Sequence, residues 1–361
     1  MKKIRTAFFG LAHPHVGALV KTVANYSDDF EMIGFAEYPM PSPDPTQYEK
    51  RRKHLTEKYG MKEYDWQELI AQKPDFAVVN SDNASREALC CALLEAGIHV
   101  LDEKPMAMTY EAAAHMVKTA KEHGVLMLTN WPIAWFPAFR KAKELADAGK
   151  IGKIMRVTYR SPATWGPFSY SPDGQLPPDE ELNQSWWYHA ENGGGSILDY
   201  ACYGAMLSTW IFGHQAEKVS GMTKNFGVKF SNVEDYSAMM LDFGDGIGLL
   251  EGSWSTYNPG EVPTGPIIHG TEGVIVCDRH TSTVKLYQGR THTPMAPTEV
   301  IDCGLDRQSE LLGAHLAHVL RGGEPDVFLA PETNLAVVAA LDAGRESANT
   351  GVTVATKHYE F

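Results

Sequence analysis

The segment FFGLAHPHVG, residues 8–17, places a glycine, small residues and a proline directly after a short apolar run. A turn of this kind between a strand and a helix binds dinucleotide diphosphates, because backbone N–H groups and the helix N-terminus attract phosphate. Against the pattern G-x-G-x-x-G, the segment keeps only Gly10, while Ala12 and His15 replace the other two glycines. The predicted nucleotide loop comprises Gly10, Leu11, Ala12, His13, Pro14 and His15.

Glu37 ends the next apolar run, 22 residues after His15. An acidic side chain at this place binds the adenosine ribose hydroxyls of NAD; the alternative is a surface glutamate. No arginine follows in residues 38–40, which favours NAD over NADP unless Arg51 or Arg52 folds back. His13 and His15 suggest a metal site, but no third ligand follows at a suitable spacing, so we expect no metal.

Three charged residues, Asp102, Glu103 and Lys104, end another short apolar run. Pro105 disfavours a helical conformation at Lys104, so the lysine is expected to lie extended on a turn. A solvated turn is the ordinary interpretation of such a run. The alternative, a lysine placed for chemistry at the end of a buried strand, depends on the rest of the chain.

Short β-like runs alternate with helical patterns over the first ~130 residues, which predicts right-handed crossovers and a doubly wound parallel sheet. The predicted strands are 4–9, 30–37, 76–80, 99–102 and 125–129. The predicted helices begin near residue 14 and cover 47–58, 84–96 and 109–123. Residues 1–130 are therefore expected to form a dinucleotide-binding Rossmann domain.

The pattern changes after residue 130. Residues 138–148 predict a helix, 161–187 a loop rich in Pro, Gly and Trp, and 331–350 a late helix. Two alternating strands within 234–254 are joined at Asp245-Gly246, a strong hairpin signal. We expect residues 131–361 to form an α+β domain with a large, mostly antiparallel open sheet that binds substrate and forms oligomers.

Composition excludes several classes of protein. A net charge of −13 over 361 residues argues against a nucleic-acid or acidic-membrane partner. The chain has no apolar run near 18 residues, so we expect no membrane span. Five cysteines without a C-x-x-C pair fit a reducing compartment, and we expect a cytoplasmic protein.

Four motifs, taken together, resemble the Gfo/Idh/MocA family of NAD(P)-dependent oxidoreductases, named after glucose–fructose oxidoreductase, inositol dehydrogenase and rhizopine catabolism. AGIHVLDEKPMA (96–107) is similar to the family's Glu-Lys-Pro signature, and GGGSILDYACYGA (193–205) to its glycine triplet before Asp-x-x-x-His. NVEDYSAMML and HGTEGVI resemble later motifs, in the family's order. The resemblance runs nearly from end to end of the chain.

The resemblance implies a catalytic set of Lys104, Asp199 and Tyr203. In the family this lysine lies beside the nicotinamide, where burial and the oxidised ring would lower its pKa toward neutrality. Tyr203 stands where histidine is usual, as in some members, and on an α-helix it would share a face with Asp199. The alternative for Tyr203 is a core aromatic.

Other positions match the family only in part. Ser81-Asp82-Asn83 stands where the family has Thr-Pro-Asn, and Arg86 stands where the family has the following histidine. These differences leave open whether Asp82 and Arg86 contact the cofactor. Besides the loop and Glu37, the implied cofactor residues are Ser81, Asn83, Glu103, Lys104 and Asn130. The implied substrate residues are Lys104, Trp131, Trp187, His189, Asp199 and Tyr203, because aromatic faces suit sugar rings.

The implied activity is hydride transfer between NAD(H) and a secondary alcohol or hemiacetal of a sugar, polyol or related ring, with NADP less favoured. Two alternatives remain: a sensor that holds a nucleotide without turnover, and an NAD-dependent glycosidase that oxidises its substrate transiently. Strands such as SAMMLDF and IGLLEGSW carry apolar residues on both faces. They predict a homodimer or homotetramer formed through this sheet.

Overall fold

The computed structural model describes residues 2–39, 45–162, 166–168, 177–256, 263–289, 295–305 and 307–359. The chain forms two compact units. The first comprises Met1–Trp131, Pro178–Gly194 and Ser309–Leu335, and the second Pro132–Pro177, Gly195–Gln308 and Ala336–Phe361. Segments from the middle and the end of the chain thus join the N-terminal unit.

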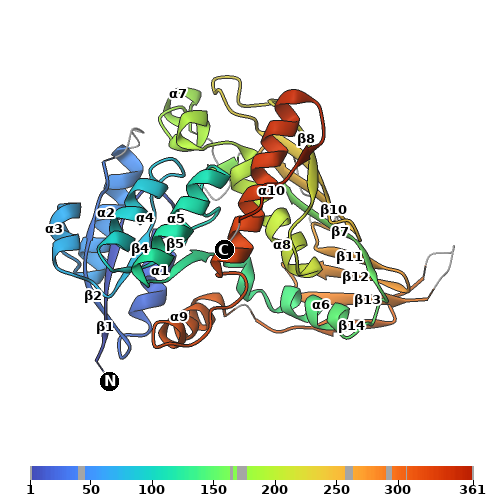
Figure 1. Ribbon diagram of the computed structural model, residues 1–361, viewed down its shortest axis with the longest axis horizontal. Helices are drawn as coiled ribbons and strands as arrows, with labels where there is room; N and C mark the ends of the chain where they lie inside the picture. The colour runs from blue at the N-terminus through green and yellow to red at the C-terminus, as the bar shows by residue number, and fades with distance from the viewer. Residues whose placement is uncertain are drawn as a thin grey trace. The chain divides into compact units, whose positions relative to one another are not determined.

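The first unit contains a six-stranded sheet in the order β3-β2-β1-β4-β5-β6, with every adjacent pair parallel (Figure 1). Its strands are β1 (Ile4–Phe9), β2 (Phe30–Ala36), β3 (Glu63–Tyr64), β4 (Phe76–Val79), β5 (His99–Glu103) and β6 (Met127–Asn130). Near-continuous apolar runs such as FAVV of β4 are fully buried, as expected for a sheet covered on both faces. The strand order reverses between β1 and β4, where such folds bind ligands.

Helices connect and flank these strands. They are α1 (Val16–Ala24), α2 (Pro45–Tyr59), α3 (Trp66–Ala71), α4 (Arg86–Glu95), α5 (Tyr110–His123) and α9 (Gln308–Val319). α5 begins at the Thr109 cap and ends at Gly124, whose φ of +65° suits glycine. The short α7 (Asp179–Leu182) also belongs to this unit.

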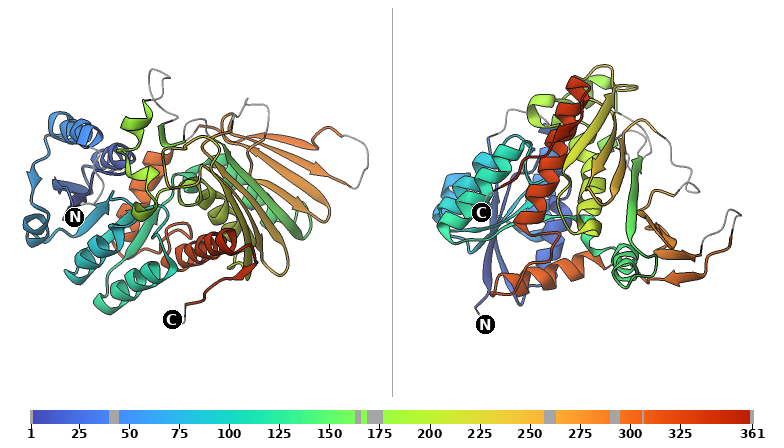
Figure 2. Two further views of the ribbon diagram at one scale, coloured as in Figure 1. Left: turned by 90° about the horizontal axis from the view of Figure 1, so that it is seen from above. Right: turned by 45° about the vertical axis from the view of Figure 1, so that its right-hand side comes forward.

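The second unit is built on a nine-stranded sheet in the order β14-β13-β12-β11-β7-β10-β9-β8-β15 (Figure 2). Its strands are β7 (Ile154–Pro162), β8 (Lys218–Lys224), β9 (Tyr236–Asp242), β10 (Ile247–Ser253), β11 (Ile267–Gly270), β12 (Gly273–Asp278), β13 (Thr283–Gln288), β14 (Glu299–Asp302) and β15 (Val354–Ala355). The pair β7–β10 is parallel and the other pairs are antiparallel. α6 (Pro137–Asp147), α8 (Cys202–Phe212) and most of α10 (Pro331–Thr350) accompany this sheet.

The central strands of this sheet alternate between two environments. Val157, Val219, Leu241 and Leu250 point to the helix-covered face and are buried. Their neighbours in sequence point to the opposite face, where a shallow hollow is lined by Thr158, Arg160, Ser220, Met222, Tyr236, Ala238, Met240, Leu249 and Glu251. On that face Met222 is 62% exposed and Met240 46%.

The predicted fold class is confirmed: a parallel, doubly wound sheet precedes a mostly antiparallel one. The hairpin at Asp245-Gly246 joins β9 to β10 as expected. α3 and α9 were not predicted, because α3 is short and α9 lacks a clear polar face. Among the described residues, each helix is too short or too polar to cross a bilayer.

Candidate functional site

The loop after β1 lies where the strand order of the first unit reverses. Gly10 has φ +79°, and a Cβ atom here would approach Ser81 N to 2.8 Å, so only glycine fits. Leu11, Ala12 and His13 are buried, whereas Pro14 is exposed and His15 half-buried. The predicted nucleotide loop is thus packed closely against the turn after β4.

Glu37 follows β2 and reaches the same loop. Its Oε1 accepts hydrogen bonds from Leu11 N (3.3 Å) and Tyr38 N (3.1 Å). Its Oε2 is buried and has no hydrogen-bond partner within the described part of the chain. Burial raises the pKa of Glu37 to about 7, against the lowering effect of these hydrogen bonds and of Arg51 and Arg52. One acceptor atom therefore remains for a ligand hydroxyl.

Arg51 of α2 folds back onto the loop, as the sequence analysis considered. Its Nη1 donates to the carbonyl oxygens of Leu11 (2.5 Å) and Ala12 (2.6 Å). Arg52 instead pairs with Glu49 and Glu63. The guanidinium of Arg51 thus braces the loop, a role that the mixed-charge pattern of α2 did not indicate.

The turn after β4 is held by buried polar contacts. Asp82 accepts hydrogen bonds from Ser85 N (2.7 Å) and Asn192 Nδ2 (3.0 Å). Asn83 Nδ2 donates to the Gly193 carbonyl at 2.7 Å, and a Cβ on Gly193 would approach Asn83 Cβ to 2.5 Å. The first glycine of the triplet is therefore required by this close approach.

Arg86 is fully buried and connects two turns of the sheet edge. Its Nη2 donates to the Ser81 carbonyl at 3.1 Å, and its Nη1 donates to the Pro105 carbonyl. Asp102 is buried nearby; burial raises its pKa well above the usual value, and the charge of Arg86 lowers it. The guanidinium of Arg86 thus fastens the turn that carries Lys104.

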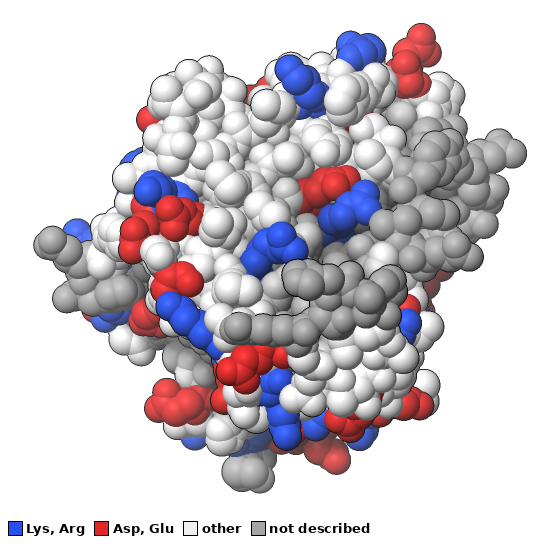
Figure 3. Space-filling view, turned by 90° about the vertical axis from the view of Figure 1, so that its right-hand side faces the viewer, with Lys and Arg blue, Asp and Glu red and all other residues white. Residues whose placement is uncertain are grey.

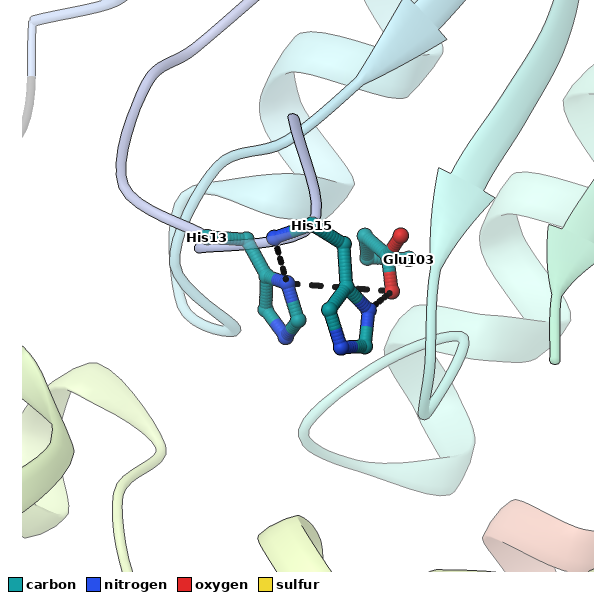
Figure 4. Close-up of side chains that lie close together, drawn as sticks. All are labelled: His13, His15 and Glu103. Carbon is teal, nitrogen blue, oxygen red and sulfur yellow. Dashed lines mark hydrogen bonds and ion pairs between the residues drawn. The ribbon is translucent and has the colours of Figure 1, made fainter. Parts of the chain in front are cut away.

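Glu103 ends β5 and is completely buried. Its Oε1 accepts a hydrogen bond from Asn130 Nδ2 at 2.8 Å, and its Oε2 lies 3.0 Å from His15 Nδ1 and 3.8 Å from His13 Nδ1 (Figure 4). One nitrogen of each histidine and a carboxylate oxygen of Glu103 all lie within 4.8 Å of one another. The sequence argument that no third ligand is available is therefore wrong, since Glu103 comes from 88 residues farther along.

Lys104 is 2% exposed, so the solvated-turn interpretation is wrong. Its Nζ lies 5.9 Å from the ring centroid of Trp187, within the range of a cation–π contact. Trp187 stacks on Trp186 at 3.8 Å, and the Trp186 indole donates to the Ala12 carbonyl at 3.3 Å. Residues 186–187 thus lie beside both the loop and the lysine, and Trp186 is a contact that the sequence analysis did not assign.

Two other aromatic candidates differ in their surroundings. Trp131 is fully buried and donates its indole N–H to Asn334 Oδ1 at 2.7 Å, and its assignment to the substrate site stays a prediction. His189 is partly exposed, with Nε2 2.6 Å from the Asn183 carbonyl and Nδ1 3.4 Å from Glu191. Of the two, His189 is the one with an exposed surface.

Several buried polar atoms at this edge of the sheet lack hydrogen-bond partners within the described residues. They are His13 Nε2, Glu37 Oε2, Asn83 Oδ1, Asn130 Oδ1 and both side-chain polar atoms of Asn80. Buried polar groups are rarely left unpaired, so such a group of atoms indicates a place where a polar ligand supplies the partners. They follow β1, β2, β4 and β6, at the edge where doubly wound sheets bind nucleotides.

Asp199 and Tyr203 lie in the second unit. Asp199 is buried in a π-helical turn, Ile197–Ala201, and its Oδ2 accepts a hydrogen bond from Trp254 Nε1 at 3.0 Å. Tyr203 is half-buried in the first turn of α8. The expectation of a single α-helix through both residues is wrong, because the π-helical turn widens the spacing; such turns are frequent at functional sites.

Two family models match the chain. The model described as "Oxidoreductase family, NAD-binding Rossmann fold" matches residues 45–130, and the model of the GFO/IDH/MocA C-terminal domain matches residues 139–276. The chain belongs to the GFO/IDH/MocA oxidoreductase family. Membership accounts for the Glu-Lys-Pro turn and the glycine triplet, which lie within the two matched stretches.

Two relatives are named as a reductase and a dehydrogenase. The 1,5-anhydro-D-fructose reductase of Ensifer adhaerens is 26% identical over 284 residues, covering 75% of this chain and 78% of that protein. The levoglucosan dehydrogenase of Pseudarthrobacter phenanthrenivorans is 27% identical over 237 residues, covering 59% of this chain and 57% of that protein.

Solved structures share the fold along almost the whole chain. A levoglucosan dehydrogenase in complex with NADH and levoglucosan has a TM-score of 0.78 at 18% identity, covering 99% of this chain and 100% of that one. The WlbA dehydrogenase of Bordetella pertussis, in complex with NADH and UDP-GlcNAcA, has a TM-score of 0.76 at 20% identity, covering 99% of each chain. These two dehydrogenases therefore share the fold of this chain.

Proposed function

We propose that this protein is an NAD-dependent dehydrogenase or reductase of a secondary alcohol or hemiacetal of a sugar, polyol or related ring. The observation that carries the proposal is the buried Lys104 at the end of β5, beside buried polar atoms that lack partners. Family membership and the sugar substrates named for the relatives support the same class of substrate.

The buried polar atoms fit a dinucleotide. Glu37 Oε2 is suited to accept from the adenosine ribose hydroxyls, and Asn83 and Asn130 each retain a buried carbonyl oxygen that has no donor among the described residues. Ser81, Glu103 and the residues of the loop after β1 complete the proposed cofactor set. Bound NAD would supply the hydride acceptor, or NADH the donor, for the reaction.

We propose NAD rather than NADP as the cofactor. A 2′-phosphate beside Glu37 would meet an ionised carboxylate above pH 7, and like charges about 4 Å apart cost roughly 1 to 4 kcal/mol. Arg51 folds back onto the loop and keeps its positive charge while it donates to the loop carbonyls, so it offsets part of this cost.

The proposed catalytic residues are Lys104, Asp199 and Tyr203. Lys104, which the Arg86-braced turn holds in place, exchanges the proton of the substrate hydroxyl or orients that hydroxyl. Tyr203 is the second proton-transfer group, and Asp199 supports the charge of the set. Trp187 and His189 contact the substrate. Residues 1–130 thus mainly bind the cofactor, and residues 131–361 mainly bind the substrate.

A homo-oligomer formed through the second unit's sheet is part of the proposal. Met222, Met240, Ile247 and Leu249 lie on the face opposite the helices. The side of the molecule shown in Figure 3 has broad uncharged areas broken by small groups of charged atoms. Exposed apolar side chains gathered on one face, such as Met222 and Met240, usually mark an interface. We also propose a cytoplasmic location, which the five free cysteines support.

The test is a panel of sugars, polyols and anhydrosugars, each mixed with NAD, or with NADH for keto substrates, and followed by NADH absorbance. We expect multiple turnovers with at least one compound and at least a 100-fold lower kcat for Lys104→Ala. Cofactor binding without turnover over the whole panel would favour the sensor alternative. Bond cleavage without stoichiometric NADH release would favour the glycosidase.

A further inference from the structure

The π-helical turn Ile197–Ala201, which carries Asp199, is fastened at its start by Glu234. The Oε1 atom of Glu234 accepts a hydrogen bond from Ile197 N at 2.9 Å. A Cβ atom on Gly195, whose φ is +104°, would approach Glu234 Oε1 to 2.6 Å. Glycine at this position therefore lets the carboxylate of Glu234 come close enough to cap the turn.

Strand β10 holds the same turn along its side. A Cβ atom on Gly252 of β10 would approach Ala201 N to 2.5 Å and the Ser196 carbonyl oxygen to 2.9 Å, so the backbone of the strand lies directly against the turn. Ser196 Oγ donates to Ser237 Oγ at 3.0 Å, and Ser237 Oγ donates to the Gly252 carbonyl at 3.1 Å. Because the packing is this close, the backbone of Asp199 is fixed in the turn.

Trp254, the residue after β10, holds the side chain of Asp199. Its indole N–H donates to Asp199 Oδ2 at 3.0 Å, and the two residues are 3% and 5% exposed. The indole is a donor only and a carboxylate is an acceptor only, so the two groups are complementary. A hydrogen bond to a carboxylate is stronger than one between neutral groups. This bond therefore holds the carboxylate in one orientation.

The ring and the backbone of Trp254 are themselves fixed. Trp254 N donates to the Asp235 carbonyl at 2.7 Å. A Cβ atom on Gly166 would approach Trp254 Cγ to 2.5 Å, so the backbone at Gly166 lies against the indole ring. Asp235 directly follows Glu234, which caps the turn of Asp199. Two adjacent residues thus fix the donor and the acceptor of the same hydrogen bond.

We propose that Trp254 is a positioning residue for the dehydrogenase reaction, because its indole N–H holds the Asp199 carboxylate in the orientation that the reaction requires. The inference rests on the proposed function, in which Asp199 supports the charge of the catalytic set. A carboxylate that is already oriented needs no rearrangement when charge develops in the transition state. Loss of the indole N–H should therefore lower kcat and leave NAD affinity unchanged.

The experiment compares the steady-state kinetics of wild type, Trp254→Phe, Asp199→Ala and the double variant, with the substrate that the panel identifies. Trp254→Phe keeps an aromatic ring and removes the indole N–H. We expect kcat to fall roughly 10- to 100-fold, the usual effect of losing a hydrogen bond to a charged group. The KM of the substrate should change by less than about threefold, because the lost interaction acts in the transition state. Calorimetry should show unchanged NAD affinity.

The double variant separates positioning from a merely structural role. Once Asp199 is replaced by alanine, the indole N–H has no carboxylate to hold. In that background Trp254→Phe should therefore change kcat by less than about twofold. A tryptophan that only packs in the core would lower kcat by the same factor in both backgrounds.

A second measurement does not depend on turnover. In protein labelled with ¹⁵N at tryptophan, the indole N–H signal of Trp254 is the NMR signal that Trp254→Phe removes. We expect Asp199→Asn to shift this signal, because the indole then donates to a neutral amide instead of a carboxylate.

Trp210→Phe is the matched control. Trp210 lies near the end of α8 in the same unit and is 7% exposed, so it is nearly as buried as Trp254. Its ring lies near the cationic groups of Arg140 and Lys143. The same loss of an indole N–H should here leave kcat within about twofold of wild type. The thermal midpoint of each variant shows whether the fold is retained.

Four outcomes would overturn the inference. They are a near wild-type kcat in Trp254→Phe, an equal loss in both backgrounds, an equal loss in Trp210→Phe, and a Trp254 signal that Asp199→Asn does not shift. A wild-type protein without turnover on the whole panel would instead overturn the proposed function, and with it the reaction that Trp254 serves. The NMR signal would still show whether the hydrogen bond forms, so the two failures are distinguishable.

Discussion

Glu37 is a residue whose ionisation should control cofactor affinity. Burial raises its pKa to about 7, so below pH 7 the carboxyl group of the free protein is largely protonated. Ribose hydroxyls donate more strongly to a carboxylate than to a carboxylic acid, so bound NAD favours the charged form. We expect NAD affinity to rise with pH, by up to about tenfold per unit, and to level off above about pH 7.

Calorimetric titrations between about pH 5.5 and 8.5 test this prediction. Glu37→Gln is the control, because its amide stays neutral and removes this component of the pH dependence. The expectation fails if wild type and Glu37→Gln show the same pH profile.

Tyr203 is proposed to transfer a proton. Tyr203→Phe removes only the hydroxyl, so the fold and NAD affinity should be unchanged while kcat falls by roughly 10²- to 10⁴-fold. Steady-state kinetics and NAD titration measure the two effects separately. Tyr203→His, which restores the commoner family residue, should retain part of the activity with a lower pH optimum. A near wild-type kcat in Tyr203→Phe would identify the ring as packing.

At the scale of elements, Arg86 of α4 connects the turns after β4 and β5. Arg86→Met should leave the carbonyls of Ser81 and Pro105 without donors and the buried Asp102 without its neighbouring cation. We expect a loss of about 2 to 5 kcal/mol in the free energy of unfolding, measured by denaturant titration. Because these turns carry Lys104, kcat should also fall.

Arg86→Lys is the informative comparison. A lysine keeps the charge but lacks the planar fork that reaches both carbonyls, so the expected loss of stability is smaller than for methionine. Equal stability of wild type and Arg86→Met would show that the two turns are held by other contacts.

At the scale of the molecule, the open face of the nine-stranded sheet should hold copies of the chain together. Met222→Lys combined with Met240→Lys places two charges on that face. We expect light scattering at micromolar concentration to give a dimer or tetramer for wild type and a smaller species for the double variant. Leu305→Lys, at another exposed apolar residue of the same unit, is the control. A monomeric wild type would contradict the proposal.

The sequence by itself determined the features that depend on neighbouring residues. The spacing of apolar residues predicted the alternating strands and helices of the first unit, because this spacing reflects which face of each element is buried. Two alternating strands joined at Asp245-Gly246 predicted the β9–β10 hairpin. The turn at 102–105 stood out for the same local reason, since charged residues rarely end a buried strand. The family motifs then indicated the chemistry, and the family models confirmed the family.

Only the tertiary structure decided which distant residues meet. Glu103 lies beside His15 from 88 positions away, and Arg51 reaches the carbonyl of Leu11 from α2. Residues 178–194 join the first unit, which brings Trp187 to Lys104. Such contacts depend on how crossovers and loops pack against the sheet. The spacing of apolar residues predicts only which face of an element a residue lies on, and it does not predict which distant residue packs against that face.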